Sequence, residues 1–512
     1  MRKILLLNVL LTVSVWPALA AVGDTFTAVT AERVEMTFSV TDEEGRTCQA
    51  GTGNGAESCV SQGTQGKVTI PGSVCGYQVT AVAPYAFNLC AQLTSVTLPD
   101  GVMEIGHHAF ANCAGLQFVS IPATVRMIGV SCFEYCRSMT AVSLPEGITE
   151  IPDMLFDNCE GLESFHIPMS VRTIGNEAFA FSGVRELEIP SGVTSIGYCP
   201  FPHVSALTVS GDNPVFSSPE GSNAVIETAT HALVAGCGGT VIPPGVTSIR
   251  SYALSHCLME TMAIPESVTS IGGHAFSGSG LRSVELPAGV TVLEDCVFEG
   301  CGRLTSVTLP DGLETIKPRC FRSCKSLAAI TLPGSLRSLG REAFGYCESL
   351  GSVAIPEGVE EIPEFAFIDC LSLREVRLPE SLRRIGDGAF VSCASLDSIS
   401  LPSGLSELGY GVFGEEPLSS IRLFCPVPPQ VDETTFMENY QTRLYVPQGC
   451  AETYRSAEVW RNFKDIVEFD ASHVAAIKPP VTQEPAYDLQ GRRLGTPPSH
   501  GIYIRGGRKY VR

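Results

Sequence analysis

The chain has 512 residues, a formal net charge of −20, and large numbers of glycines (50) and prolines (34). The excess of acidic residues argues against a nucleic-acid ligand and against attachment to an anionic membrane surface. Length alone would allow roughly three or four globular domains. A repeat of fixed period overrides that estimate, because a stack of repeats can grow without the size limit of a single core.

The first 20 residues predict a secretory signal peptide. Arg2 and Lys3 form a charged start, residues 4–15 are apolar, and Ala18-Leu19-Ala20 provides small residues for cleavage. The apolar run is too short to span a bilayer comfortably, and no later run reaches 18 apolar residues, so no transmembrane segment is predicted. We therefore expect export, and a mature chain that starts at Ala21 with a net charge of −22 because two basic residues are removed.

Residues 21–66 lie outside the repeat and are interpreted as an N-terminal cap, which a solenoid needs because its first coil would otherwise expose an apolar face. Residues 34–40 (VEMTFSV) alternate between apolar and polar side chains and predict a strand. Residues 48–66 are rich in glycine, serine and glutamine and predict turns. An oxidising compartment would permit one disulfide among three cysteines outside the repeat register, Cys48, Cys59 and Cys75.

Residues 67–423 contain a 23-residue repeat, which is clearest in five consecutive units that begin at Leu304, Leu327, Leu350, Leu373 and Leu396. The shared form is L-x-x-V/I-x-L/I-P-x-x-V/L-x-x-I/L-x-x-x-A/C-F-x-x-C. One unit is too short to bury its own apolar face, so neighbouring units are expected to stack around one continuous core.

Each unit is expected to form a short strand and a return leg. Residues 93–99 (LTSVTLP) show the alternation of a strand with one buried face, and Pro99 ends that strand because it has no N–H to donate. Gly106 permits a tight bend, and Phe110 follows on a short helical or 3₁₀ turn and fills the coil interior. The sequence predicts a solenoid of about 14 coils, built mainly from short parallel β-strands with short helical or 3₁₀ turns and capped at both ends.

The register of the repeat breaks at residues 204–239. Residues 224–227 and 232–235 predict the two strands of a hairpin, and we expect a loop or hairpin that protrudes from the solenoid. A role in packing is the simpler interpretation. Contact with a ligand is the alternative, because loops on rigid scaffolds often carry binding.

Residues 424–470 are interpreted as a C-terminal cap. The segment predicts a strand at 444–446 and a short helix at 452–460. Two cysteines, Cys425 and Cys450, flank the cap and could form a disulfide. Three aromatic side chains are expected to cover the last coil, namely Tyr454, Trp460 and Phe463.

The repeat resembles the BspA-like, or Treponema-type, leucine-rich repeat family, whose units read L-x-x-I-x-I-P-x-x-V-x-x-I-G-x-x-A-F-x-x-C. The resemblance covers roughly residues 68–420, with many positions recurring in register. It implies a secreted or cell-surface protein that is used for adhesion and binding rather than for catalysis.

The C-terminal end carries a second resemblance. Residues 471–484 read as a linker, and residues 485–512 contain YDLQGR (487–492) and GIYI (501–504). These two segments resemble the C-terminal tails of proteins exported by Bacteroidetes, including sorting domains of the type IX secretion system, although the tail is shorter. The resemblance implies a Bacteroidetes-like source and an export or attachment tag. An additional β-hairpin without a transport role is the alternative.

Ten cysteines recur three residues after the repeat phenylalanine or its leucine substitute. Stacking would place their Cα atoms about 5 Å apart, within the range for a disulfide, but their side chains would point the same way. Ser182 and Ser279 take the same place in two units, so we expect small buried side chains with weak hydrogen bonds along a spine. The ten are Cys90, Cys113, Cys136, Cys159, Cys257, Cys301, Cys324, Cys347, Cys370 and Cys393.

The sequence predicts no catalytic, cofactor or metal site. Cys132-x₃-Cys136 and Cys320-x₃-Cys324 resemble zinc half-sites, but their first cysteines take the alanine place of the repeat. His107-His108 is the only histidine pair, and adjacent residues do not share a face. The chain has no phosphate-binding loop, dinucleotide-binding, hydrolase or zinc-protease motif, and no recurring pair of carboxylates. The protein is therefore expected not to be an enzyme.

The solvent-facing strand positions, two and four residues before each repeat proline, are mostly small and hydroxylated. They predict either a plain solvated sheet or a flat surface that accepts an extended protein or glycan. The least ordinary members of this stripe are its candidate ligand-binding residues, Phe118, His166, Glu186, Glu188, Glu375 and Arg377.

These observations predict an exported, secreted or cell-surface protein that binds an extracellular protein or glycan, in adhesion to host or neighbouring cells. Many weak contacts would add up along a rigid, preorganised surface. The alternative is a structural component of a surface assembly, in which the solenoid acts as a spacer.

Overall fold

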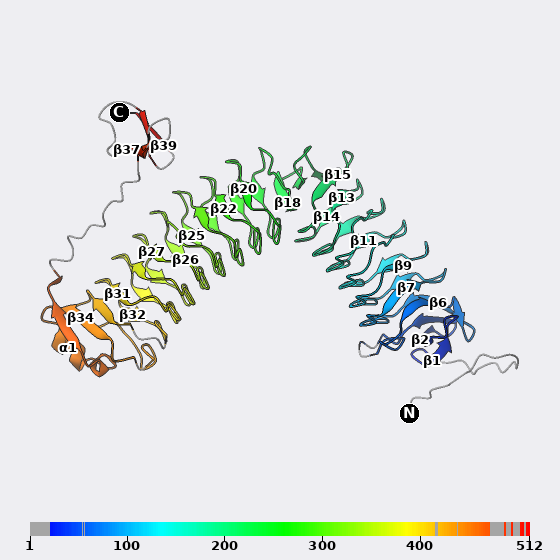
Figure 1. The fold of residues 1–512 in the computed structure, drawn as a ribbon, viewed down its shortest axis with the longest axis horizontal. Coiled ribbons are helices and arrows are strands. Elements are labelled where there is room, and N and C mark those ends of the chain that lie inside the picture. The colour runs from blue at the N-terminus through cyan, green and yellow to red at the C-terminus, as the bar shows by residue number, and fades with distance from the viewer. Residues whose placement is uncertain are drawn as a thin grey trace.

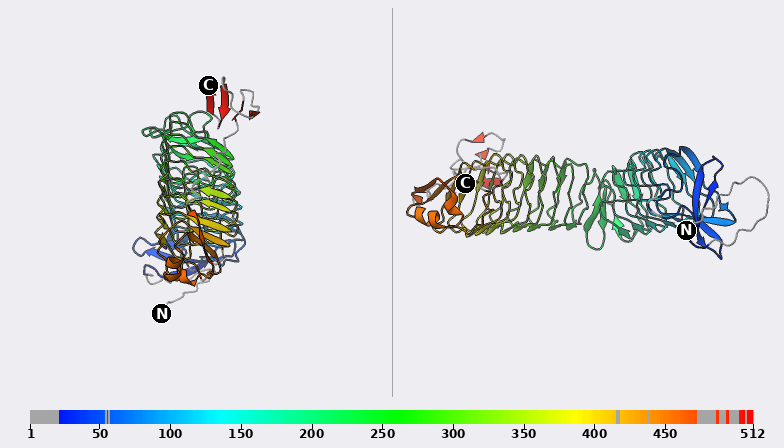
Figure 2. Two further views of the ribbon diagram at one scale, coloured as in Figure 1. Left: turned by 90° about the vertical axis from the view of Figure 1, so that its left-hand side faces the viewer. Right: turned by 90° about the horizontal axis from the view of Figure 1, so that it is seen from below.

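The computed structural model describes residues 21–53, 55, 57–414, 418–437 and 439–471, and four short strands between 486 and 511. Figure 1 shows one arched solenoid, and Figure 2 shows it from two further sides. The solenoid has about 17 turns with a spacing of about 23 residues. The number of turns exceeds the predicted 14, because strands of the 204–239 segment and of the terminal segments continue the stack. The predicted signal peptide (1–20) and most of the predicted linker (471–484) lie outside the described residues.

Two rows of parallel strands run along the solenoid. The longer strands stop at or just before the repeat proline, and they form what we call the strand face. They are β4 (Gly66–Thr69), β7 (Leu93–Thr97), β9 (Phe118–Ser120), β13 (Glu186–Ile189), β15 (Ala206–Val209), β20 (Thr261–Ala263), β22 (Ser283–Glu285), β24 (Ser306–Thr308), β27 (Ser352–Ala354), β29 (Glu375–Arg377), β31 (Ser398–Leu401), β33 (Ser420–Leu423), β34 (Arg443–Pro447) and β35 (Ile466–Phe469). The strand face is divided into several short sheets rather than the one long sheet expected from the repeat.

The second row lies on the return leg, where mostly two residues per coil pair in parallel with the next coil. Its members are β6 (Tyr77–Val82), β8 (Glu104–Ile105), β10 (Met127–Ile128), β11 (Glu150–Ile151), β12 (Thr173–Ile174), β14 (Ser195–Ile196), β18 (Ala232–Gly236), β19 (Ser248–Ile249), β21 (Ser270–Ile271), β23 (Val292–Leu293), β25 (Thr315–Ile316), β26 (Ser338–Leu339), β28 (Glu361–Ile362), β30 (Arg384–Ile385) and β32 (Glu407–Leu408). β5 (Ser73–Val74) pairs antiparallel with β6.

The third side of each coil is a run of overlapping turns, which we call the turn rim. The predicted helical or 3₁₀ turn is wrong here, because residues two before and two after the repeat phenylalanine have positive φ, as in His108 (52°) and Asn112 (61°). Alternate amides also donate to the next coil: the Phe110 N–H bonds the Cys132 carbonyl at 2.9 Å. The turn rim therefore links neighbouring coils as the strands do.

The repeat phenylalanines form two stacks inside the solenoid. Successive ring centroids are 5.1–6.0 Å apart from Phe87 to Phe201, and 5.3–6.4 Å apart from Phe276 to Phe436. Leu254 takes the intervening place and is fully buried. Stacking at these distances adds to the free energy gained by burying the rings.

The cysteine spine has the predicted arrangement. The Cys113 Sγ donates to the Phe87 carbonyl at 3.0 Å, and the Cys347 Sγ donates to the Phe321 carbonyl at 3.2 Å, each reaching the preceding coil. Burial raises the pKa of the Cys347 thiol to about 12, so the buried side chain stays protonated and can donate.

The expected disulfides are absent. All twenty cysteines lie in the described part of the chain, and all are free thiols. Cys48 and Cys59 are buried, whereas Cys75 is exposed at the tip of the β5–β6 hairpin. In the C-terminal cap, the Cys425 Sγ instead donates to the Pro402 carbonyl at 3.0 Å, and Cys450 stays unpaired.

The start of the chain packs onto the first coil as antiparallel strands. β1 (Thr25–Val29), β2 (Glu35–Asp42) and β3 (Thr47–Ala50) pair in sequence order, and β3 continues in parallel to β6. The strand predicted at 34–40 is confirmed by β2. Turns were predicted for residues 48–66. The first of these residues instead belong to β3 (Thr47–Ala50), because this strand extends the return-leg sheet.

The irregular segment is part of the stack rather than a protrusion. β16 (Phe216–Ser217), β17 (Ala224–Glu227) and β18 pair antiparallel, which confirms the hairpin, but every residue of β18 is buried. Val225 and Val234 pack into the core of the first half, whereas Ile226 and Leu233 pack into the core of the second half. The hairpin therefore forms a wall between two cores, near the top of the arch in Figure 1.

The C-terminal cap closes the second core. α1 (Ala451–Ser456) and the 3₁₀ helix η1 (Trp460–Asn462) replace the single helix predicted at 452–460, because Ala457 is extended and Val459 has a φ of 65°. Tyr454, Trp460 and Phe463 are buried as predicted, and the rings of Trp460 and Phe463 lie 5.1 and 4.9 Å from Phe436.

The tail contains β36 (Ala486–Tyr487), β37 (Arg493–Leu494), β38 (Ile502–Arg505) and β39 (Arg508–Val511), paired as a four-stranded antiparallel sheet. Among the described residues, no helix is both long and apolar enough to cross a membrane.

Candidate functional site

The strand face presents small polar side chains to solvent. In β22, β24 and β29 the central valine is buried while the flanking residues point outward, as the alternation predicts. Ser95 is an exception, because it is only 4% exposed. Its register partners are Lys67 and Phe118, whose longer side chains flank it. The face is otherwise open along much of the solenoid.

A shallow groove of about 490 Å³ lies on this face over β20, β22 and β24. Its lining combines small or hydroxylated side chains with apolar ones such as Met262, Ile264 and Leu286, and two carboxylates are its ionisable groups. The small or hydroxylated residues of the groove are Thr261, Ala263, Ser283, Ser306 and Thr308, and its carboxylates are Glu266 and Glu285. This surface can donate and accept hydrogen bonds and is acidic, so it suits a neutral or basic extended ligand.

The structure places the six predicted residues on the strand face but does not bring them together. Phe118 is 46% exposed on β9, about three coils and about 15 Å before Glu186 and Glu188 of β13. His166 is exposed in the coil before β13 and is the nearest of the six to those carboxylates. None of the six lines the groove.

Glu375 and Arg377 lie on β29, in the second half of the solenoid. The Arg377 Nε lies 2.7 Å from the Glu375 Oε1, and each side chain is about half exposed. This ion pair neutralises both groups locally, and its screened position makes it worth little for stability. The predicted stripe is therefore several separate places on one face.

The end of the strand face carries a group of residues that the sequence did not predict. The guanidinium carbon of Arg422, on β33, lies 5.4 Å from the ring centroid of Tyr445 and 5.4 Å from that of Phe469. Cation–π contacts of this kind hold a guanidinium without an acid. The regular units end at about Ser420, so no repeat register relates these three residues to one another.

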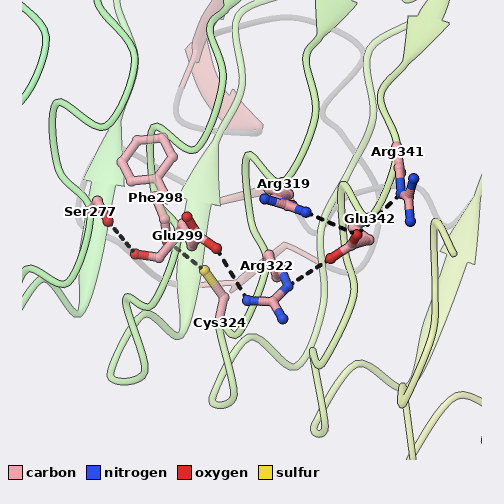
Figure 3. Close-up of polar contacts among 8 residues, drawn as sticks. All are labelled: Ser277, Phe298, Glu299, Arg319, Arg322, Cys324, Arg341 and Glu342. Atoms are coloured by element: carbon pink, nitrogen blue, oxygen red, sulfur yellow. Dashed lines mark hydrogen bonds and ion pairs between the residues drawn. The ribbon is translucent and has the colours of Figure 1, made fainter.

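The turn rim carries an ionic ladder that is also invisible in the repeat consensus. Figure 3 shows Glu342, which is 8% exposed, among the guanidinium groups of Arg319, Arg322 and Arg341 at 3.4, 2.8 and 3.2 Å. Arg322 also lies 3.2 Å from Glu299 of the preceding coil. Charges from three successive coils are thus joined across the rim.

An acidic segment occupies the equivalent rim of the first half. Asp157 is 9% exposed, and its Oδ1 has no hydrogen-bond partner among the described residues. Burial, reinforced by the neighbouring carboxylates of Glu134 and Glu177, raises the pKa of Asp157 to about 6, although a hydrogen bond from Asn158 opposes the rise. This carboxyl titrates near neutral pH.

A stack of short parallel strands around a leucine- and phenylalanine-lined core, with one sheet face open, defines a leucine-rich-repeat solenoid. A family model described as a BspA type leucine rich repeat region matches residues 80–208, 247–344 and 317–442, in six copies. The chain belongs to this BspA-type leucine-rich repeat family, which confirms the resemblance seen in the repeat.

Solved bacterial structures are also similar. A leucine rich cell surface protein of Faecalibacterium prausnitzii is 27% identical, with 69% of this chain and 94% of that chain covered at a TM-score of 0.49. A leucine-rich repeat protein of Bacteroides ovatus is 27% identical. The match covers 76% of this chain and 98% of that chain at a TM-score of 0.40. The pneumococcal vaccine antigen PcpA is 17% identical. The match covers 88% of this chain and 100% of that chain at a TM-score of 0.48. The comparison with curated proteins gives no match.

Proposed function

We propose that this protein is an exported recognition protein that holds an extended segment of an extracellular protein or glycan against its strand face. Adhesion to a host or neighbouring cell is the purpose such binding would serve. The groove over β20, β22 and β24 carries the proposal, because its volume of about 490 Å³ lies within the range of ligand sites. Its backbone is fixed by two parallel strand pairings, so little order has to be created on binding.

The side chains of the groove restrict the chemical class of ligand that it can bind. Hydroxyl groups of Thr261, Ser283, Ser306 and Thr308 suit hydrogen bonds to sugar hydroxyls or to a peptide backbone. Glu266 and Glu285 disfavour sulfated or other acidic glycans, as does the net charge of the chain. A neutral glycan or a neutral to basic peptide segment therefore fits best.

Export is part of the same proposal. The charged start, apolar run and small residues of positions 1–20 support a cleaved signal peptide. The YDLQGR and GIYI segments support a sorting or attachment role for residues 485–512, of the kind used by Bacteroidetes. Comparing the secreted fraction of cells that express the chain with and without residues 485–512 tests this role directly.

The binding proposal is tested by screening the chain without residues 1–20 against extracellular-matrix proteins and a glycan array. Ser306→Arg places a long side chain in the groove and is expected to abolish a saturable hit. Ser398→Arg is the matched control, because Ser398 is an exposed serine at the same strand position on β31, away from the groove. It is expected to bind normally.

Three outcomes would contradict the proposal that the ligand binds in the groove. Equal binding by both arginine variants would place the ligand elsewhere. If only a variant with alanine at Phe118, Glu186 and Arg377 loses binding, the ligand binds at the strand-face residues that were predicted from the sequence. Self-association of the protein, without any hit on either panel, would favour the alternative of a structural spacer in a surface assembly.

A further inference from the structure

The turn rim brings His274 of one coil close to Cys296 and Glu299 of the next coil, which follow it by 22 and 25 residues in the sequence. His274 lies two residues before Phe276, and in the next coil Cys296 lies two residues before Phe298 while Glu299 lies one residue after it. The ligating atoms of His274, Cys296 and Glu299 all lie within 4.8 Å of one another. Each residue offers a different donor: an imidazole nitrogen, a sulfur and a carboxylate oxygen.

The three side chains are held in place by their neighbours. The Tyr252 ring stacks on the His274 ring with centroids 4.5 Å apart and an angle of 5° between the planes. Cys296 is 6% exposed, and its φ of 58° fixes the backbone turn that carries it. Arg322 binds Glu299 at 3.2 Å, as Figure 3 shows, and so orients the carboxylate. His274 and Glu299 remain partly exposed, which leaves a path from solvent.

We propose that His274, Cys296 and Glu299 bind one divalent transition-metal ion of the zinc class. Zinc sites use these three donor types, and three protein ligands leave the fourth tetrahedral position for water. Bond lengths of about 2.0–2.3 Å require ligand atoms about 3.5 Å apart, so the side chains need to close by about 1 Å. A thiolate and a carboxylate together would balance the charge of the ion.

The first half of the solenoid contains an internal comparison. Tyr85, His108, Ser131 and Glu134 take the places of Tyr252, His274, Cys296 and Glu299. The Tyr85 and His108 rings also stack, with centroids 5.0 Å apart, and the His108 Nδ1 lies 3.5 Å from the Glu134 Oε2. A serine hydroxyl is a much weaker zinc ligand than a thiolate, so this place is expected to bind no metal tightly.

A purely structural role is the competing explanation. Without a metal, the Cys296 thiol donates a hydrogen bond to Glu299, and burial together with this bond raises the pKa of the thiol to about 12. Glu299 would then act only in the ionic ladder of the turn rim, through its ion pair with Arg322. The two explanations differ in whether the thiolate binds a metal ion.

Cobalt is the probe, because a thiolate-bound Co²⁺ ion absorbs in the near ultraviolet through charge transfer and four-coordinate Co²⁺ absorbs in the visible. The full mature chain, kept reduced, is titrated with CoCl₂. We expect one equivalent to produce both bands, and Zn²⁺ to displace them and to raise the melting temperature. Cys296→Ser should abolish the charge-transfer band, and Ser131 shows that serine is accommodated at this rim position.

His274→Ala and Glu299→Gln should each weaken the affinity at least about tenfold. His108→Ala is the matched control for the histidine, and Cys75→Ser is the control for the exposed thiol; both should leave the titration unchanged. A wild-type titration without a charge-transfer band, or a band that survives in Cys296→Ser, would overturn the proposal. The folded state of every variant is checked by its far-ultraviolet circular dichroism.

Discussion

The buried carboxyl of Asp157 makes the stability of the first half of the solenoid depend on pH. Its pKa rises from 3.8 to about 6 on folding, mainly because the ionised form loses its hydration. The folded state therefore binds more protons than the unfolded state between these values. The contribution of this one carboxyl to stability is greatest below about pH 4 and is lost as the pH rises towards 7.

The perturbation is Asp157→Asn, which keeps the shape of the side chain and removes the ionisation. A rise from 3.8 to about 6 corresponds to about 3 kcal/mol, of which about 2 kcal/mol accrues between pH 4.5 and pH 7.5. The free energy gained by the variant over wild type should be larger at pH 7.5 than at pH 4.5 by about that amount.

The assay is equilibrium urea denaturation of both proteins at the two pH values, followed by far-ultraviolet circular dichroism. Glu134→Gln provides a second measurement, because removing this neighbouring charge should lower the Asp157 pKa and recover part of the gain. An equal difference between Asp157→Asn and wild type at both pH values would refute the reasoning. A larger difference at pH 4.5 would refute its sign.

Three further predictions concern the interior and the rim. Phe344→Ala should cost about 3–5 kcal/mol in urea denaturation, because the ring is fully buried and stacked on both sides, whereas a cost near zero would contradict the stacked spine. A thiol reagent should label Cys75 rapidly in the native protein, Cys450 more slowly and the other eighteen cysteines only after unfolding; rapid labelling of many thiols would show a looser core. Glu342→Gln should lower stability by about 1–3 kcal/mol at low salt, since three guanidinium groups lose their shared carboxylate, and an unchanged or higher stability would contradict the ladder.

Much of the fold follows from local sequence pattern. The alternation in residues 93–97, the proline after each strand and the recurring phenylalanine and cysteine places predict strand, coil interior and spine, because each coil contacts mainly its neighbours. The hairpin at 224–235 was also predictable from its strand pattern. Its burial was not, because residues such as Val225 and Leu233 reveal two opposed cores only when both halves of the stack are in place.

The candidate sites show the same division. The strand pattern alone predicts that Glu285, Glu375 and Arg377 point outward, since their strand positions fix the face on which they lie. The position of the groove on the strand face, the distances between the predicted residues, and the approach of His274 to Cys296 and Glu299 all depend on how the coils stack. Contacts between coils are set by the stacking distance, the curvature and the backbone conformation of the turn rim, whereas a repeat consensus describes only the residues within one coil.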